Sequence, residues 1–207
     1  DEYKNAINEN IKSVNGLTNT LNGLNNELIY FEREIADSWI DSFIPEGEID
    51  KVYRDYMATG MAKIASETRE AIASDIEKMD EDEIIAAYAK VTGSTIEEVE
   101  KDIENKLYTI EDITNSIIDN AVYSNAYSQL NKNVGDFKTA VGVDNDLLNK
   151  IVYSGGDISS YNDLTQDQVT TLVGTDGSGG LLNDKTVVDE LTRLYGKDFV
   201  TNVKNYL

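Results

Sequence analysis

Acidic side chains are the first candidates for chemistry in this sequence, because 39 of its 207 residues are aspartate or glutamate. A dense run of them lies between positions 75 and 83, and calcium binds about six to eight oxygen ligands of this kind. Carboxylates at one helix N-terminus, however, cannot surround an ion, and no EF-hand spacing occurs. We therefore predict that the run caps a helix and holds no metal. Its members are Asp75, Glu77, Asp80, Glu81, Asp82 and Glu83.

A second candidate is the segment Asp176-Gly-Ser-Gly-Gly180, which is similar to the start of a calcium or phosphate loop. It has no lysine in the spacing of a phosphate loop, and an EF-hand loop beginning at Asp176 would need glutamate where Val187 stands. We predict a flexible surface turn here and no bound cofactor.

The sequence contains no histidine and no cysteine. Disulfides, thiol nucleophiles, Ser-His and Cys-His catalytic pairs and zinc sites with Cys or His ligands are therefore excluded. A glycosidase needs only two carboxyl groups about 5 to 10 Å apart, but among 39 acids such a pair carries no information. We expect the single tryptophan, Trp39, to lie in the core or at a hairpin tip rather than in a sugar cleft. We predict no catalytic residues and no enzymatic activity.

Tyrosines are the remaining candidates for recognition, and the sequence has twelve of them. Tyrosine offers a large contact area at low entropic cost, so several together could form a binding surface. For any one of them, however, we favour a half-buried structural position with the hydroxyl group in water. The candidates are Tyr53, Tyr56, Tyr88, Tyr108, Tyr123, Tyr127, Tyr153, Tyr161 and Tyr195.

The charge balance limits the partners, because 18 basic residues stand against 39 acidic ones and the net charge is −21. The long-range field repels phosphate, so we exclude nucleic acid as a partner and disfavour anionic membrane surfaces. No run of about 18 apolar residues occurs, so we predict no membrane insertion by this segment. We likewise expect no signal peptide within this segment. Basic partners and divalent cations remain compatible with the charge.

The elements that must position these side chains begin with a long helix. Apolar residues recur every three or four positions from Ile7 to Ile35, which is nearly an unbroken heptad seam with one slip. This spacing predicts one amphipathic helix over residues 1–43. Gly16 and Gly23 each cost such a helix about 1 kcal/mol relative to alanine, so it needs a packing partner. The seam consists of Ile7, Ile11, Val14, Leu17, Leu21, Leu24, Leu28, Phe31 and Ile35.

A corner follows this helix, because Pro45 biases the preceding residue away from helical dihedral angles and Gly47 supplies a flexible backbone. A second long helix is expected over residues 48–79. Two long helices joined by a short turn most simply form an antiparallel hairpin. We therefore predict a coiled-coil-like hairpin over residues 1–79, which buries the seam against the returning helix.

From residue 80 onward the pattern changes to short, well-capped helices. Ser94-Thr-Ile-Glu97 reads as a capping box, and Thr109 opens a further helix. Strand character is weak, and residues 137–143 and 169–173 are its best candidates. The expected helices cover residues 80–90, 94–107, 109–130, 144–153, 165–173, 185–195 and 197–206.

Together these expectations define an all-α chain. We predict one helical domain over residues 1–207, in which the hairpin of residues 1–79 is followed by a compact head of short helices over residues 80–207. The chain begins at Asp1 rather than methionine, so we expect a mature or excised piece of a longer protein.

Two resemblances bear on function. Trp39 near a hairpin turn is placed as in the small secreted hairpins of type VII secretion systems, but the Trp-x-Gly of those proteins is replaced by Trp39-Ile-Asp41, so we do not assign the chain to them. The capped segments MDEDEIIAAYAK and YNDLTQDQVTTLVG resemble inserts in extracytoplasmic domains of bacterial permeases. That resemblance implies an extracytoplasmic location and transfers no site residue.

Three functions remain open. The first is a non-catalytic extracytoplasmic interaction domain of a larger bacterial surface or membrane protein, such as a permease or receptor ectodomain, whose partner is a protein or a cell-surface ligand. The second is a structural or assembly component of a phage or secretion system, which forms homo-oligomers through the N-terminal seam. The third is a glycan hydrolase that uses carboxylates alone.

Overall fold

The fold of this chain is all-α, as predicted, in a computed structural model that describes residues 2–157, 164–175 and 178–207. Within helix α1 the side chains of residues 2–8, 11, 19 and 22–27 lie outside the described set. The helices are α1 Glu2–Phe43, α2 Lys51–Ile76, α3 Glu81–Thr92, α4 Ile96–Glu104, α5 Ile110–Val141, α6 Asp146–Tyr153, α7 Gln166–Val173, the 3-10 helix η2 Leu181–Asn183, α8 Lys185–Tyr195 and α9 Phe199–Tyr206. Strands β1 Gly174–Thr175 and β2 Ser178–Gly179 form one small antiparallel pair.

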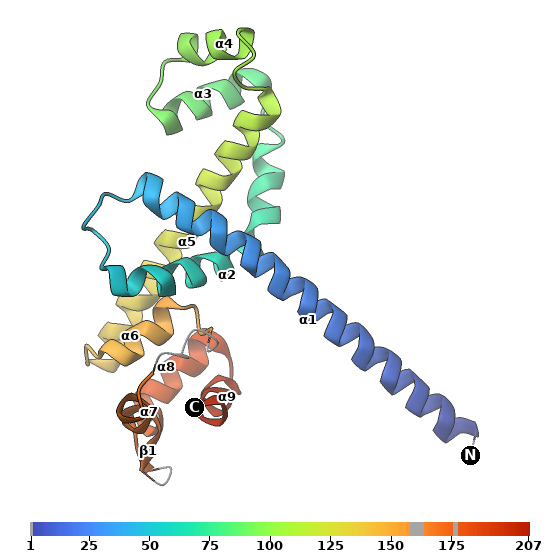
Figure 1. Ribbon diagram of the computed structural model, residues 1–207, viewed down its shortest axis with the longest axis vertical. Coiled ribbons are helices and arrows are strands. Elements are labelled where there is room, and N and C mark those ends of the chain that lie inside the picture. Colours follow the sequence, from blue (N-terminus) through green and yellow to red (C-terminus); the bar gives the residue numbers. More distant parts are fainter. Residues whose placement is uncertain (1, 158–163, 176–177) are drawn as a thin grey trace.

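Helix α1 is a long rod, and only its carboxyl-terminal part packs on the rest of the molecule (Figure 1). The loop after it contains Pro45 and Gly47, and the positive φ of 94° at Gly47 favours glycine at that position. Helices α1 and α2 contact each other beside this loop, an arrangement consistent with the predicted hairpin. The amino-terminal part of α1 leaves the body and ends far from it (Figure 1).

The predicted burial of the seam against a returning helix is wrong for the described side chains. Those of Val14, Leu17, Leu21, Leu28, Phe31 and Ile35 are 36–64% exposed. Helix α1 packs on the body through a different face, which carries the buried residues Glu32, Ala36 and Ile40 at four-residue spacing. Heptad spacing shows that a stripe must be covered, but an intramolecular and an intermolecular partner produce the same pattern.

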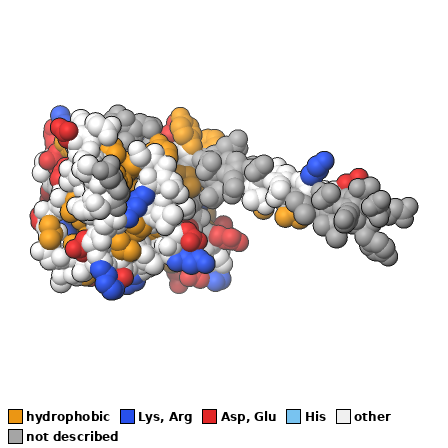
Figure 2. Space-filling view, turned by 90° about the horizontal axis from the view of Figure 1, so that it is seen from below, with side chains coloured by type: hydrophobic (Ala, Val, Ile, Leu, Met, Phe, Trp, Pro, Cys, Tyr) orange, Lys and Arg blue, Asp and Glu red, His pale blue; other side chains and the backbone are white. Residues whose placement is uncertain are grey.

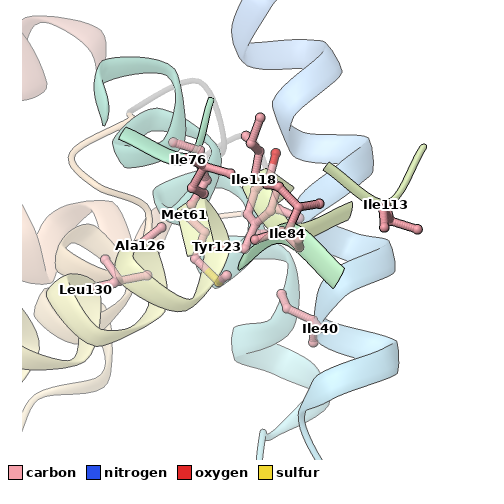
Figure 3. Packing of buried hydrophobic residues seen from close by; sticks show 14 of the residues in the cluster. Ile40, Met61, Ile76, Ile84, Ile113, Ile118, Tyr123, Ala126 and Leu130 are labelled. Carbon is pink, nitrogen blue, oxygen red and sulfur yellow. The ribbon is translucent and has the colours of Figure 1, made fainter. Parts of the chain in front are cut away.

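Two hydrophobic clusters form the body, and α5 contributes to both. The first joins the carboxyl-terminal part of α1 to α2, α3, α4 and the first two thirds of α5, with Met61, Tyr123 and Leu130 fully buried (Figure 3). The second joins the end of α5 to α6, α7, η2, α8 and α9. Tyr153 packs against both clusters. The 32-residue α5 is therefore the common support of the whole body.

Helix α5 is longer than predicted, because it continues past Leu130 to Val141. The residues after Leu130 keep helical spacing on the buried side, where Val134 and Phe137 follow it, and Gly135 lies on the exposed side. The possible strand at 137–143 is therefore wrong over its first five residues. The one at 169–173 is wrong as well, because it lies in α7.

Capping side chains begin the short helices. Asp80 accepts a hydrogen bond from the backbone N–H of Glu83, whose side chain accepts one from the N–H of Asp80. Thr109 and Asp112 make the same reciprocal pair at the start of α5. At α4 the capping residue is Thr95 with its partner three residues later, one position beyond the predicted box. Asp80 to Glu83 therefore cap the start of α3, as predicted, whereas Asp75 and Glu77 lie at the end of α2.

Candidate functional site

The exposed seam of α1 is the first candidate site. Its described members lie at heptad spacing, since Val14, Leu17 and Leu21 are followed at the same register by Leu28 and Phe31. Figure 2 shows the rod leaving the body, with hydrophobic side chains at its surface where these are described. Such a stripe of exposed large apolar groups on a single helix is typical of a surface that another helix covers.

The middle of the seam, from Val14 to Leu24, lies on a segment without charge. Residues 13–26 contain no Asp, Glu, Lys or Arg, although the whole chain carries a net charge of −21. Two hydroxyl groups of this segment are satisfied within the helix, because Thr18 donates to the carbonyl oxygen of Val14 at 2.9 Å and Thr20 to that of Gly16 at 3.0 Å. This surface therefore holds apolar and uncharged polar side chains only. Two copies would not repel each other here, as they would at the acidic surface of the body.

A buried ion pair fixes the direction in which the rod leaves the body. Glu32 of α1 is 2% exposed, and its carboxylate accepts hydrogen bonds from Arg69 of α2 at 2.5 and 2.9 Å. Arg69 also donates to Asp119 of α5 at 2.7 Å. The hydroxyl group of Tyr123 donates to the Glu32 carboxylate. One guanidinium group thus ties α1, α2 and α5 together at the point where α1 departs.

The protonation of this cluster favours the charged pair. The hydrogen bond to Glu32 raises the pKa of Arg69, so its guanidinium stays charged. Burial, followed by the hydrogen bond to Glu32, raises the pKa of Tyr123, so its hydroxyl group stays a donor. Every charged member therefore has an opposite charge or a donor beside it, which a buried ion pair requires.

The predicted recognition tyrosines are divided between several surroundings. Tyr53, Tyr127 and Tyr153 line one cavity beside α2, α5 and α6. Tyr123 is fully buried, and Tyr161 lies outside the described residues. Each remaining candidate packs against another group through its ring. Tyr56 lies under the Lys150 ammonium, Tyr88 contacts Tyr108, and Tyr195 contacts Phe199.

Trp39 packs against the core, as predicted. Its ring stacks on Phe43 at a centroid distance of 5.3 Å and lies 6.0 Å from the ring of Tyr127. The indole therefore lies next to Tyr127, which lines the tyrosine cavity, although Trp39 does not line it.

The other sequence candidates are not brought together. Asp176 and Gly177, on which the predicted turn falls, lie outside the described residues, and the flanking β1 and β2 pair with each other antiparallel. Across the part of the chain that the structure describes, no three acidic side chains are placed to hold a metal ion. The described helices include none that is long and apolar enough to cross a membrane.

Comparison of the chain with protein-family models, with curated proteins and with solved structures finds no match. The candidate sites therefore depend on geometry alone. Sequence reasoning missed the Glu32–Arg69–Asp119 cluster, because its members are separated by 37 and 50 residues and no local pattern marks them. The one available signal was Glu32, a charged residue that shares the four-residue spacing of Ala36 and Ile40 on the face that packs.

Proposed function

We propose that this protein is a non-catalytic assembly protein in which the α1 seams of two copies form a coiled coil. The observation that supports this function is the heptad-spaced apolar face on the part of α1 that leaves the body. A two-fold pair of identical helices places the same apolar stripe on both sides of the interface. The two bodies would then be held together by their rods, as in the structural role considered from the sequence.

A second copy is the partner that the charges favour. A foreign partner of an acidic protein usually brings basic groups, yet residues 13–26 offer such groups no carboxylate. The uncharged segment of one copy can pair with the same segment of another copy. Contact through this segment also keeps the two acidic bodies apart. The glycines at 16 and 23 weaken the isolated helix, and pairing would offset that cost.

The expected strength of the dimer follows from the exposed side chains. Burying one half-exposed seam residue stabilises by on the order of 1 kcal/mol, and the described seam residues of two copies together contribute on the order of 10 kcal/mol. Association itself costs about 4–15 kcal/mol. With an association cost at the low end of that range, about 6 kcal/mol remains, so we expect a weak dimer with a dissociation constant on the order of 10–100 µM.

Substitution of Leu21 tests the seam. Leu21→Glu is expected to weaken the dimer by about a hundredfold or more, because two carboxylates would enter an apolar interface that has also lost two leucines. Sedimentation equilibrium of the full chain measures the dissociation constant. The matched control is Asn15→Glu, which adds the same charge to an exposed position away from the seam. Equal weakening by both substitutions would show that charge alone acts, and would overturn the seam as the interface.

We also propose that this assembly works outside the cytoplasm, as part of a larger bacterial surface or membrane protein. The absence of cysteine and the high negative charge, which keeps an exposed protein soluble, support this setting. The full reading frame tests it, since an export signal or a membrane segment is expected. A complete frame with neither feature would contradict it.

A further inference from the structure

A cavity beside α2, α5 and α6 is the second feature that the structure offers for function, and its volume is about 510 Å³. The loop before α2 contributes Glu48 and Asp50, while α2 contributes Tyr53. Helix α5 contributes Tyr127, and the opposite wall is built by the start and the inner face of α6. The cavity is therefore formed by segments far apart in the sequence, and it is large enough for an amino acid or a polyamine.

Negative charge dominates the lining. Glu48, Asp50, Asp144 and Asp146 line the cavity, against the single cation Lys138. Lys138 lies 3.2 Å from Asp144, and Lys150 of α6, which does not line the cavity, lies 3.2 Å from Asp146, so two of the four carboxylates are paired with a lysine. The hydrogen bond from Tyr53 lowers the pKa of Asp146, and that from Asn149 lowers the pKa of Asp144, so both are ionised at neutral pH. The lining keeps a net negative charge.

Aromatic faces accompany these carboxylates. The rings of Tyr53 and Tyr153 lie 5.2 Å apart at an angle of 50°, and Tyr127 lines the same cavity. The hydroxyl group of Tyr53 donates to Asp146, which fixes the ring. Tyrosine faces attract cations through the ring quadrupole. A cation in this cavity would therefore be attracted both by the carboxylates and by the faces of the tyrosine rings.

A buried acceptor without a donor gives an independent indication of a ligand. Asn149 is 5% exposed and lines the cavity, and its amide nitrogen donates to Asp144 at 2.6 Å. Its amide oxygen has no hydrogen-bond partner among the described residues. Leaving a buried acceptor unpaired costs about 1–3 kcal/mol, so such atoms usually have a partner. This oxygen is closed to solvent in the structure, so a ligand N–H group would supply the missing donor when ligand binding opens the side chains over it.

We propose that this cavity binds an organic cation that carries N–H donors, namely a primary ammonium or a guanidinium group. Its charge faces the carboxylates, its body lies against the tyrosine rings, and one N–H donates to Asn149. The described residues include no cluster of acids suited to a metal ion, and the lining repels anions. This binding site is independent of the α1 seam, since no seam residue lines the cavity.

Fluorescence of Trp39 reports on this cavity in the full chain. It is the only tryptophan, and its ring lies 6.0 Å from that of Tyr127. Spermidine and a terminally blocked arginine peptide supply the two sources of N–H cations, a free amine and a protein side chain. Saturable binding of either one supports the site, and the tighter of the two identifies the source. Tetramethylammonium, which has the charge but no N–H, is expected to bind roughly tenfold more weakly because Asn149 stays unpaired.

Matched charge variants separate the cavity from the general acidity of the protein. Glu48 lines the cavity, whereas Glu46 on the same loop does not. Glu48→Gln is expected to weaken spermidine or peptide binding roughly tenfold, and Glu46→Gln to leave it unchanged. If neither probe bound saturably up to about 10 mM, the proposal would be overturned, because a specific site for ligands of this size binds more tightly than that. Equal effects of the two substitutions, or equal affinity for tetramethylammonium, would also overturn it.

Discussion

Arg69→Ala is expected to lower the free energy of unfolding by about 3–5 kcal/mol. The substitution leaves the Glu32 carboxylate, 2% exposed, without the guanidinium that balances its charge. It also removes the donor to Asp119 and so loosens α5 from α2 at the same point. Urea denaturation followed by far-ultraviolet circular dichroism measures the change. The whole of this loss is expected because one buried charge without a partner costs far more free energy than the removal of both charges of the pair.

Two comparisons make this prediction specific. Arg54→Ala removes the exposed pair with Asp41 and is expected to cost no more than about 1 kcal/mol. The double variant Arg69→Met with Glu32→Leu removes both charges and is expected to recover most of the stability, since apolar groups of similar volume can replace a buried pair. If Arg69→Ala were no more harmful than Arg54→Ala, the cluster would not be the anchor of α1.

Gly60→Ala is expected to cost about 3 kcal/mol or more, because the added methyl group has no room. A Cβ atom at Gly60 would lie inside the contact distance of the Tyr153 carbonyl oxygen and 3.0 Å from the backbone nitrogen of Gly155. Both neighbours are main-chain atoms at the end of α6, which cannot rotate away. The substitution should therefore push α6 from α2 and lower the midpoint of thermal unfolding by about 6–12 °C or more.

Gly135→Ala is the matched control for this prediction. Gly135 lies in α5 on the exposed side, and nothing stands within 4 Å of its added Cβ. Alanine should raise stability there by up to about 1 kcal/mol, since glycine is the poorer helix former. A loss at Gly60 no larger than about 1 kcal/mol would mean that α2 and α6 do not approach each other as closely as the structure shows.

The local elements of the fold could be predicted from the sequence, because their signals are local. Heptad spacing predicted α1, Pro45 and Gly47 predicted the corner, and Asp80 predicted the start of α3. The predicted length of α5 was too short, because the polar residues after Leu130 resembled a loop. Val134 and Phe137 nevertheless continue the buried face of the helix.

Contacts between distant elements could not be predicted in the same way. The seam showed that one stripe of α1 needs a cover, but whether α2 or another molecule provides it depends on tertiary geometry. The body instead uses the face of Glu32, Ala36 and Ile40. Tyr53 lies about 100 residues from Tyr153 and from the orphan acceptor Asn149, so their meeting in the cavity depends on how α2, α5 and α6 pack.

The molecular mass of the unaltered chain in solution tests the central proposal most directly. Static light scattering from about 10 to 500 µM brackets the expected dissociation constant. If the α1 seams pair, the mass rises with concentration from 23.0 kDa toward twice that value. A mass that stays at 23.0 kDa over the whole range would contradict the coiled-coil assembly.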